Sequence, residues 1–269
     1  MQNLFKCSCK EDIYENLKTF FAHPGTLLVR GREIVEINNY CLANPLKSDM
    51  RVLDLGCAEG NIGSMVFNKI DVGLDMYFNE LKEARKHLVY QEFALADARN
   101  MPFKDESFDV IFSNSVIEHI NDLDCVLIEV SRSLSNNGLF IFTVPTSEFS
   151  HNLYITRIFE KIGCALLGKM YAKIRNKQLN HFNLFNDLEW SEKLNKFSLN
   201  TIYKKHYLSR AEVYEWDKIC IFLRIAKPFK LLYKNLIGRF YGKTISLLSN
   251  RHTSDTGSCV FMVAQKRRK

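Results

Sequence analysis

Short apolar runs alternate with helical segments between residues 50 and 145, and this alternation constrains the fold more than any other feature of the chain. The expected strands are Arg51–Leu55, Asp71–Leu74, Phe93–Ala96, Phe108–Phe112 and Leu139–Val144. The expected helices lie near Gly60–Phe67, Asn79–His87 and Asp122–Leu134. Strands that alternate with helices predict an α/β fold with a mostly parallel sheet and right-handed crossovers.

The regions on either side follow other patterns. Near the N-terminus, His23-Pro24-Gly25 predicts a turn and Gly31–Cys41 a helix. After Pro145, basic helical stretches are expected at 151–180 and 218–248, with Pro228 splitting the second. Between them lie an expected helix at 183–196 and an extended run at 197–206, and a last strand is expected at 258–264. We therefore predict a helical segment at 1–48, a core formed by 49–149 and 255–265, and a helical insertion or lid at 150–254.

Composition and cysteine usage indicate an intracellular protein. The chain has 269 residues, of which 46% are hydrophobic and 25% charged, as in a folded domain with a core. It has no signal-peptide pattern and no apolar run long enough to cross a membrane, so we expect a cytoplasmic protein. The eight cysteines are scattered, which favours reduced thiols. Cys7 and Cys9 alone do not supply four ligands, so no metal centre is expected.

The motif most directly linked to chemistry is the run Val52-Leu53-Asp54-Leu55-Gly56-Cys57-Ala58-Glu59-Gly60. An apolar strand enters a loop whose glycines permit a tight turn and close approach to a ligand. Asp75 ends the next strand, about 20 residues on, where a carboxylate can accept hydrogen bonds from ribose hydroxyls. Either element alone is also explained by an ordinary βα turn or a surface acid.

Two further elements follow in order: Ala96-Asp97-Ala98 with Met101-Pro102-Phe103, and Ser107-Phe108-Asp109-Val110-Ile111-Phe112-Ser113-Asn114. Together the four elements resemble class I S-adenosylmethionine-dependent methyltransferases, in particular the small-molecule branch similar to methyltransferase type 11. The resemblance covers Arg51–Pro145 and extends to Ser258–Ala264. It implies a Rossmann-like three-layer sandwich with a mostly parallel seven-stranded sheet, and S-adenosyl-L-methionine as the cofactor.

The resemblance also implies roles for matching residues. Asp54, Gly56, Cys57 and Gly60 would surround the methionine part of the cofactor. Asp75 would bind the ribose hydroxyls with Met76 beside the adenine, Asp97 and Ala98 would contact the adenine, and Ser113 and Asn114 would lie near the sulfonium. The family commonly has glycine where this chain has Ala58, and alanine is tolerated there if its φ stays negative. A dehydrogenase is disfavoured because its Gly-x-Gly-x-x-Gly spacing fails at Ala58 and Asn61.

Two histidines are candidates for the catalytic base. A hydroxyl acceptor would benefit from a base with a near-neutral pKa, which suits histidine. His119 lies in the Glu118-His119 pair after the fourth strand, and His181 begins the segment after the first basic helix, where relatives often have a similar His-Phe pair. Both histidines could instead be structural. An Asn/Asp-Pro-Pro-aromatic motif is absent, which favours oxygen or carbon acceptors over the exocyclic amines of nucleic-acid bases.

The charge distribution indicates an anionic partner. The net charge is +7, and no Asp or Glu occurs between Asp217 and Asp255. In that span apolar residues recur at three- and four-residue steps, with lysines on another side: Phe222, Ile225, Phe229, Leu232, Leu236 and Phe240, and Lys227, Lys230 and Lys234. Such a segment either lies on an anionic membrane, at its inner face, or packs its apolar stripe on the core as a lid.

These observations predict a methyltransferase that acts on a small-molecule, lipid or lipid-linked saccharide acceptor, through oxygen or carbon. The basic helix expected at Ser150–Lys177, together with the basic segment at 218–248, is consistent with a phosphate or carboxylate on that acceptor. The alternatives are a non-catalytic binding protein with the same fold and an RNA methyltransferase. Basic patches also attract nucleic acid, but the chain has no recognised RNA- or DNA-binding module.

Overall fold

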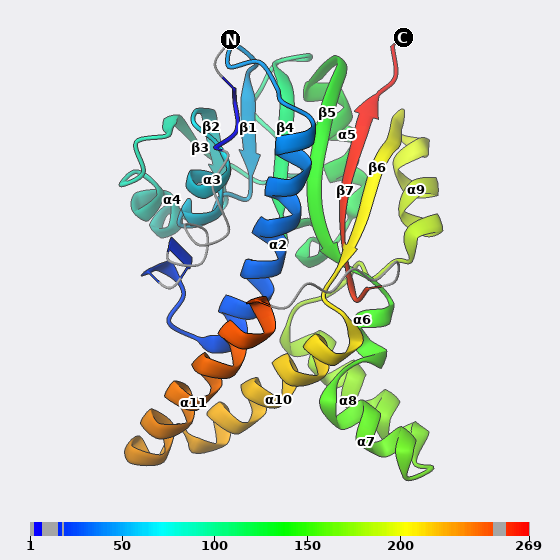
Figure 1. Ribbon diagram of the computed structural model, residues 1–269. Coiled ribbons are helices and arrows are strands. Elements are labelled where there is room, and N and C mark those ends of the chain that lie inside the picture. Colours follow the sequence, from blue (N-terminus) through cyan, green and yellow to red (C-terminus); the bar gives the residue numbers. More distant parts are fainter. Residues whose placement is uncertain (1–2, 7–15, 18, 250–256, 269) are drawn as a thin grey trace.

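A seven-stranded sheet forms the centre of the computed structural model, which describes residues 3–6, 16–17, 19–249 and 257–268 (Figure 1). The strand order is β3-β2-β1-β4-β5-β7-β6, and β7 runs antiparallel to both neighbours whereas β1 to β5 are parallel. The strands are β1 (Val52–Leu55), β2 (Ile70–Asp75), β3 (Tyr90–Leu95), β4 (Phe108–Asn114), β5 (Leu134–Pro145), β6 (Leu199–Tyr207) and β7 (Cys259–Lys266). The predicted Rossmann-like architecture is confirmed.

Helices cover both faces of the sheet because side chains alternate along each strand. In β4, Val110 and Phe112 pack toward α2, α3 and α4, whereas Ile111 packs toward α5 and α9. The helices are α2 (Pro24–Ala43), α3 (Asn61–Val66), α4 (Phe78–Ala84), α5 (Leu123–Ser133), α6 (Glu148–His151), α7 (Tyr154–Lys161), α8 (Ala165–Gln178), α9 (Asp187–Lys196), α10 (Arg210–Ala226) and α11 (Lys230–Ser249), with a short 3-10 helix η1 (Ile117–His119). The two buried clusters and the sheet between them make the three layers.

Helix α2 begins earlier than the sequence predicts. The expected turn at residues 23–25 is instead the start of the helix, so that prediction is wrong. His23 is the N-cap, and its Nδ1 accepts a hydrogen bond from the backbone N–H of Gly25 at 3.1 Å. Pro24 follows at the first helical position, where its missing N–H costs nothing.

Four helices, α7, α8, α10 and α11, extend away from the sheet and form what we call the helical foot (Figure 1). Residues 227–229, including Pro228, separate α10 from α11, as predicted. The foot is tied to α2 through Arg32, whose Nε donates to Glu212 Oε1 at 2.6 Å and whose guanidinium also donates to the carbonyl of Leu247 at 2.7 Å. Among the described helices, none combines the length and apolar character needed to span a bilayer.

One strand falls within the range predicted as a helical insertion. β6 pairs with β7 as the edge of the central sheet, although its residues lie inside 150–254. The extended run predicted at 197–206 therefore belongs to the sheet. Cys7 and Cys9 lie outside the described residues.

Candidate active site

The loop after β1 turns sharply at residues with positive φ. Gly56 has φ 75° and Gly60 has φ 77°. A Cβ built on Gly56 would lie 2.5 Å from Cγ1 of Val116, so no other residue fits there. Ala58 also has a positive φ, 45°, which corrects the expectation that its φ stays negative. Its backbone N–H donates to Asp75 Oδ2 at 2.9 Å, and this bond helps hold the strained residue in place.

Two buried carboxylates lie beside this loop. Asp75 also accepts, through Oδ1, a hydrogen bond from the N–H of Tyr77 at 2.9 Å. Asp54 Oδ2 accepts from the hydroxyl of Tyr90 at 2.6 Å. Burial raises the pKa of Asp54 to about 7, although the Tyr90 hydroxyl opposes that change. The loop is therefore lined by acidic groups that favour a ligand carrying positive charge.

Two adjoining cavities open along this loop. The larger, about 590 Å³, is lined by Asp75, Met76, Asp97 and Ala98, among others. The smaller, about 310 Å³, is lined by residues that include Arg30, Asp54, Cys57 and Asn114. Both cavities are also lined by Gly56, Ala58, Glu80, Ser115 and Val116. They form one cleft at the carboxyl ends of β1, β2 and β4, where parallel sheets bind their ligands.

Two of the residues predicted to contact the cofactor do not line the cleft. Ser113 is fully buried and points away from it, because Phe112 and Asn114, one position to either side on the strand, face the smaller cavity. Ser115 lines both cavities instead. Gly60 precedes α3, and a Cβ there would come within 2.9 Å of Tyr90. Gly60 therefore shapes the loop, whereas Ser113 does not reach the cleft.

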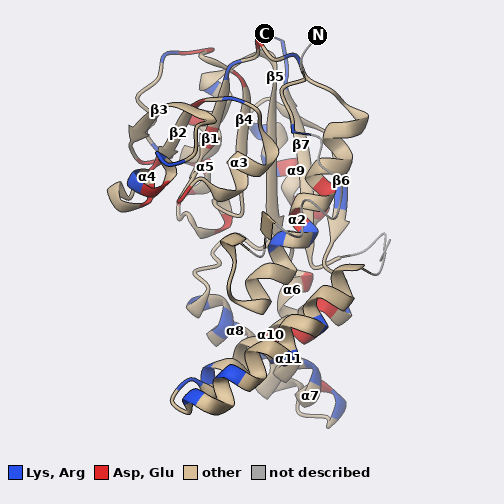
Figure 2. Ribbon diagram, turned by 60° about the vertical axis from the view of Figure 1, so that its left-hand side comes forward, with Lys and Arg blue, Asp and Glu red and all other residues tan. Residues whose placement is uncertain are grey.

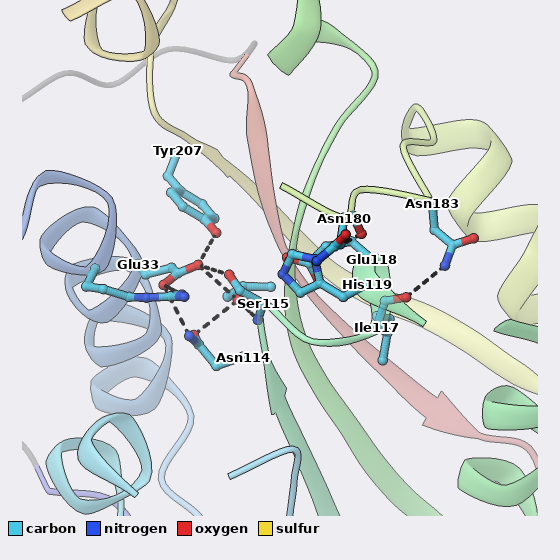
Figure 3. Close-up of polar contacts among 11 residues, drawn as sticks. Glu33, Asn114, Ser115, Ile117, Glu118, His119, Asn180, Asn183 and Tyr207 are labelled. Carbon is cyan, nitrogen blue, oxygen red and sulfur yellow. Dashed lines mark hydrogen bonds and ion pairs between the residues drawn. The ribbon is translucent and has the colours of Figure 1, made fainter. Parts of the chain in front are cut away.

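A buried carboxylate from α2 supports the floor of the cleft (Figure 3). Glu33 Oε1 accepts hydrogen bonds from Ser115 Oγ at 2.5 Å and from Tyr207 Oη at 2.8 Å, and Oε2 accepts from Asn114 Nδ2 at 3.1 Å. Arg30 pairs with the same carboxylate at 2.5 Å. Burial by itself would raise the pKa of Glu33, but Arg30 and the donors outweigh it and the pKa is lowered. This network was missed from the sequence because no motif marks α2.

The two candidate histidines meet although they are distant in sequence. The rings of His119 and His181 have centroids 5.3 Å apart. His119 lines the larger cofactor cavity, whereas His181 lines a separate pocket of about 560 Å³. Phe182 lines both. The histidine pair therefore stands at the junction between the cleft and this second pocket.

The second pocket, which we call the α8 pocket, is basic. Three exposed lysines of α8, one turn apart, contribute to its lining together with Glu160: Lys169, Lys173 and Lys177. Burial, followed by the nearby His119 and Arg175, lowers the pKa of His181 to about 4, so this imidazole is neutral near pH 7. A neutral imidazole has a lone pair on one ring nitrogen, and this nitrogen can accept a proton or bind a metal ion.

The fold and the loop define a class of protein: a Rossmann-like methyltransferase that binds S-adenosyl-L-methionine. A family model described as a methyltransferase domain matches residues 46–199, more than half of the chain. The chain belongs to this methyltransferase family. The dehydrogenase considered from the sequence is thereby set aside.

Relatives and solved structures agree with this assignment. The chain is 35% identical to a malonyl-[acyl-carrier protein] O-methyltransferase of Hamiltonella defensa over 94 residues, 34% of this chain and 36% of that protein. It is 28% identical to a trans-aconitate 2-methyltransferase of Variovorax paradoxus over 115 residues, 40% and 44% of the two chains. Phosphoethanolamine N-methyltransferase 2 of Haemonchus contortus, solved with S-adenosyl-L-methionine, shares the fold with a TM-score of 0.57 at 20% identity, over 88% of this chain and 52% of that one. The chain spans about a third to a half of the length of the first curated relatives.

The cleft fits the cofactor. Gly56 lines both cavities without a side chain of its own, and the position of its missing Cβ is taken by Val116, which lines both cavities as well. Carboxylates line both cavities, and Arg30 supplies a positive charge in the smaller one. A ligand with ribose hydroxyls, a sulfonium and an amino-acid end has a chemically matching neighbour for each of these groups.

Proposed function

We propose that the cleft holds S-adenosyl-L-methionine with its nucleoside in the larger cavity and its methionine part in the smaller one. Asp75 binds the ribose hydroxyls, and Asp97 with Ala98 contacts the adenine. Asp54 attracts the ammonium group, and Arg30 attracts the carboxylate, because each group meets the opposite charge. The shared lining of the two cavities at Gly56, where a continuous ligand would pass, supports this orientation.

The acceptor is a small molecule with a phosphate or carboxylate, methylated on oxygen or carbon, and it lies in the α8 pocket. The observation that carries this proposal is the row of three lysines in a pocket that adjoins the cofactor cavity at Phe182. Lysines bind phosphates and carboxylates through charge-assisted hydrogen bonds. The relatives named for malonyl and trans-aconitate acceptors support a carboxylate, since both names denote carboxylic acids.

The protein contributes mainly alignment and exclusion of water. An acceptor oxygen attacks the methyl carbon in line with the carbon–sulfur bond. The new carbon–oxygen bond forms as the carbon–sulfur bond breaks, and its electron pair stays on sulfur, giving S-adenosylhomocysteine. Where the acceptor is a hydroxyl, its proton passes to His181 or His119, whose pKa values burial lowers so that each is neutral at pH 7.

Transfer of a labelled methyl group to matched acceptor pairs tests this function. Each pair consists of a phosphate- or carboxylate-bearing compound and its neutral ester or amide, and lipid-linked sugar phosphates form one set. We expect incorporation only with the anionic member of a pair. Equal incorporation into neutral members would contradict the proposal, and salt-sensitive incorporation into RNA would favour the RNA methyltransferase instead.

We further propose that the helical foot docks on an anionic membrane, where a lipid-linked acceptor would be presented. Large apolar side chains of the foot lie in solvent: Ile225 is 64% exposed, Phe229 63% and Leu231 75%. Lys227, Lys230 and Lys234 accompany them, and Figure 2 shows basic residues at the ends of the foot away from the sheet. Apolar side chains beside lysines complement the interface of a bilayer with anionic headgroups.

Sedimentation with phosphatidylglycerol vesicles and with neutral phosphatidylcholine vesicles tests the docking. We expect binding to the anionic vesicles at low salt, and loss of that binding in the variant K227E/K230E/K234E. The control K47E/K82E/K104E changes the net charge equally outside the foot. Binding that falls equally in both variants would indicate a nonspecific charge effect and would overturn the docking surface.

A further inference from the structure

Three side chains that commonly bind metals converge at the junction of the two pockets. Glu118 and His119 come from η1, and His181 follows α8. One carboxylate oxygen and one ring nitrogen from each histidine all lie within 4.8 Å of one another. Ligands of a bound transition metal lie about 3 Å to 3.5 Å apart, as expected for metal–ligand bonds near 2 Å. Small rotations of the three side chains would bring their donor atoms onto one ion.

The hydrogen bonds of the cluster resemble those around metal ligands. His119 Nδ1 lies 3.2 Å from the backbone carbonyl of Asn180, and a proton donated there leaves the Nε2 lone pair free. Metal-ligating histidines usually have such a partner on the second nitrogen. Nε2 lies 3.6 Å from Glu118 Oε1 (Figure 3).

Two polar atoms of the cluster have no partner among the described residues. Glu118 is 1% exposed, yet its Oε2 makes no hydrogen bond, and the same holds for the buried Nδ1 of His181. A buried carboxylate oxygen without a partner costs free energy, on the order of 1–3 kcal/mol or more. A bound cation would satisfy both the carboxylate and the imidazole.

The backbone around the cluster is already organised. The carbonyl of Glu118 accepts hydrogen bonds from the N–H groups of Phe182 at 2.8 Å and Asn183 at 3.2 Å. Asn183 Nδ2 also donates to the carbonyls of Ile117 and Ile120, each at 2.8 Å (Figure 3). These bonds clamp the loop that carries Glu118 and His119 to the segment that carries His181. The three ligands are therefore held together without a metal.

We propose that Glu118, His119 and His181 bind a divalent transition metal of the zinc type. Two imidazoles and one carboxylate suit zinc, cobalt or nickel, and three protein ligands leave at least one position open. Sequence spacing gave no sign of this site, since His181 is far from the other two ligands in the chain. This proposal departs from the expectation, drawn from the sequence, that the chain has no metal centre.

The role of the metal rests on the proposed function. The open position adjoins both the cofactor cavity and the α8 pocket, since His119 lines the first and His181 the second. An acceptor hydroxyl or carboxylate oxygen bound there would be oriented toward the methyl group. With the metal bound, His119 and His181 would hold the ion and would not take the proton, so a hydroxyl at the open position would release its proton to solvent before its oxygen attacks the methyl carbon.

Cobalt binding tests the site without any acceptor or cofactor. The metal-free protein is titrated with Co²⁺ while the visible d–d absorption is recorded, and Zn²⁺ is then added as competitor. We expect saturation at one Co²⁺ per chain with the absorption of a four- or five-coordinate ion. In Glu118→Gln and His181→Ala, the affinity should fall by about 100-fold or more, as expected when one of three ligands is lost.

His151→Ala is the matched control, because His151 is an exposed histidine at the α8 pocket outside the cluster. It should bind Co²⁺ like the parent. No binding by the parent, or equal binding by all variants, would overturn the site. Thermal unfolding of each variant shows whether it is folded, and His119→Gln provides a second conservative variant. Metal binding without methylation of anionic acceptors would leave the site in place and overturn the proposed function.

Discussion

The cofactor cleft and the helical foot differ in charge and in how they bury apolar side chains. The charged residues that line the cleft are mainly carboxylates, whereas three lysines line the α8 pocket on the foot. The central strands β1, β4 and β5 bury their apolar residues almost completely, as with Phe112 at 0% exposure. The foot leaves Leu231 at 75% and Leu166 at 72%. The centre of the sheet is therefore a closed core, whereas the foot carries exposed apolar side chains that the proposed docking would cover.

The largest expected effect is loss of cofactor binding in Asp75→Ala, with no effect on the foot. Asp75 holds the loop through Ala58 and Tyr77 and is the proposed ribose ligand. Its charged hydrogen bonds are each worth about 1.5–3 kcal/mol, so we expect the Kd for S-adenosylmethionine to rise about 10- to 150-fold. Calorimetry measures this, with Asp105→Asn, an exposed acid outside the cleft, as the control. If Asp75→Ala bound S-adenosylmethionine as tightly as the parent, the acidic character of the cleft would not explain how the cofactor is recognised.

Removing the lysine charges of the α8 pocket should weaken acceptor binding and leave cofactor binding unchanged, which is the opposite of the result expected for Asp75→Ala. In K169A/K173A/K177A we expect KM for an anionic acceptor to rise about tenfold, since 1.4 kcal/mol corresponds to a factor of ten, while the cofactor Kd stays the same. The lysines are exposed, which limits the effect. The control K47A/K82A/K104A removes the same charge elsewhere. Equal KM values for the two triple variants would show that the pocket does not select acceptors by charge.

The acidic cleft also predicts a pH dependence, both of stability and of cofactor binding. Burial raises the pKa of Asp54 to about 7, above its value in the unfolded chain. The native state therefore holds this proton more tightly, and its contribution to stability is full below pH 4 and is lost as pH rises through about 7. Cofactor binding should show the opposite trend, because ionised Asp54 attracts the ammonium group. Asp54→Asn should flatten both dependences in urea unfolding and calorimetry.

The smallest expected effect is on the stability of the foot. Leu231→Ser changes a side chain that is 75% exposed, so the free energy of unfolding should change by no more than about 0.5 kcal/mol. Phe112→Ala in the sheet should cost about 3–5 kcal/mol. Urea denaturation compares the two variants. A large loss in Leu231→Ser would mean that the leucine is buried in solution, for instance against a second copy.

The sequence predicts the strands of the sheet and the helices of the foot far better than the full site. The strands β1 to β5 and β7 and the residues of the glycine loop follow from local patterns, because periodicity and turn chemistry act over short distances. The resemblance places Ser113 near the sulfonium, whereas Ser115 lines the cleft, because the motif gives the strand but not which of its faces meets the cleft. Arg30 and Glu33 carry no motif, and their role depends on where α2 packs.

The histidines show a similar limit. His119 and His181 were each identified from their position along the chain, but only the fold brings their rings to 5.3 Å. The hydrogen bonds of Asn183, which hold the two segments together, depend on backbone carbonyls and leave no trace in residue spacing. Contacts between distant segments are decided by packing, which a single sequence does not display.

The strand order has a consequence for synthesis of the chain. β6 pairs only with β7, yet β7 is made after α10 and α11. While the ribosome is producing the foot, β1 to β5 can already pair, whereas β6 has an open edge on both sides. Exposed strand edges invite aggregation, so the nascent chain passes through a vulnerable stage that ends when β7 inserts between β5 and β6. The antiparallel edge of the sheet is thus assembled last, on parallel strands that have had time to fold.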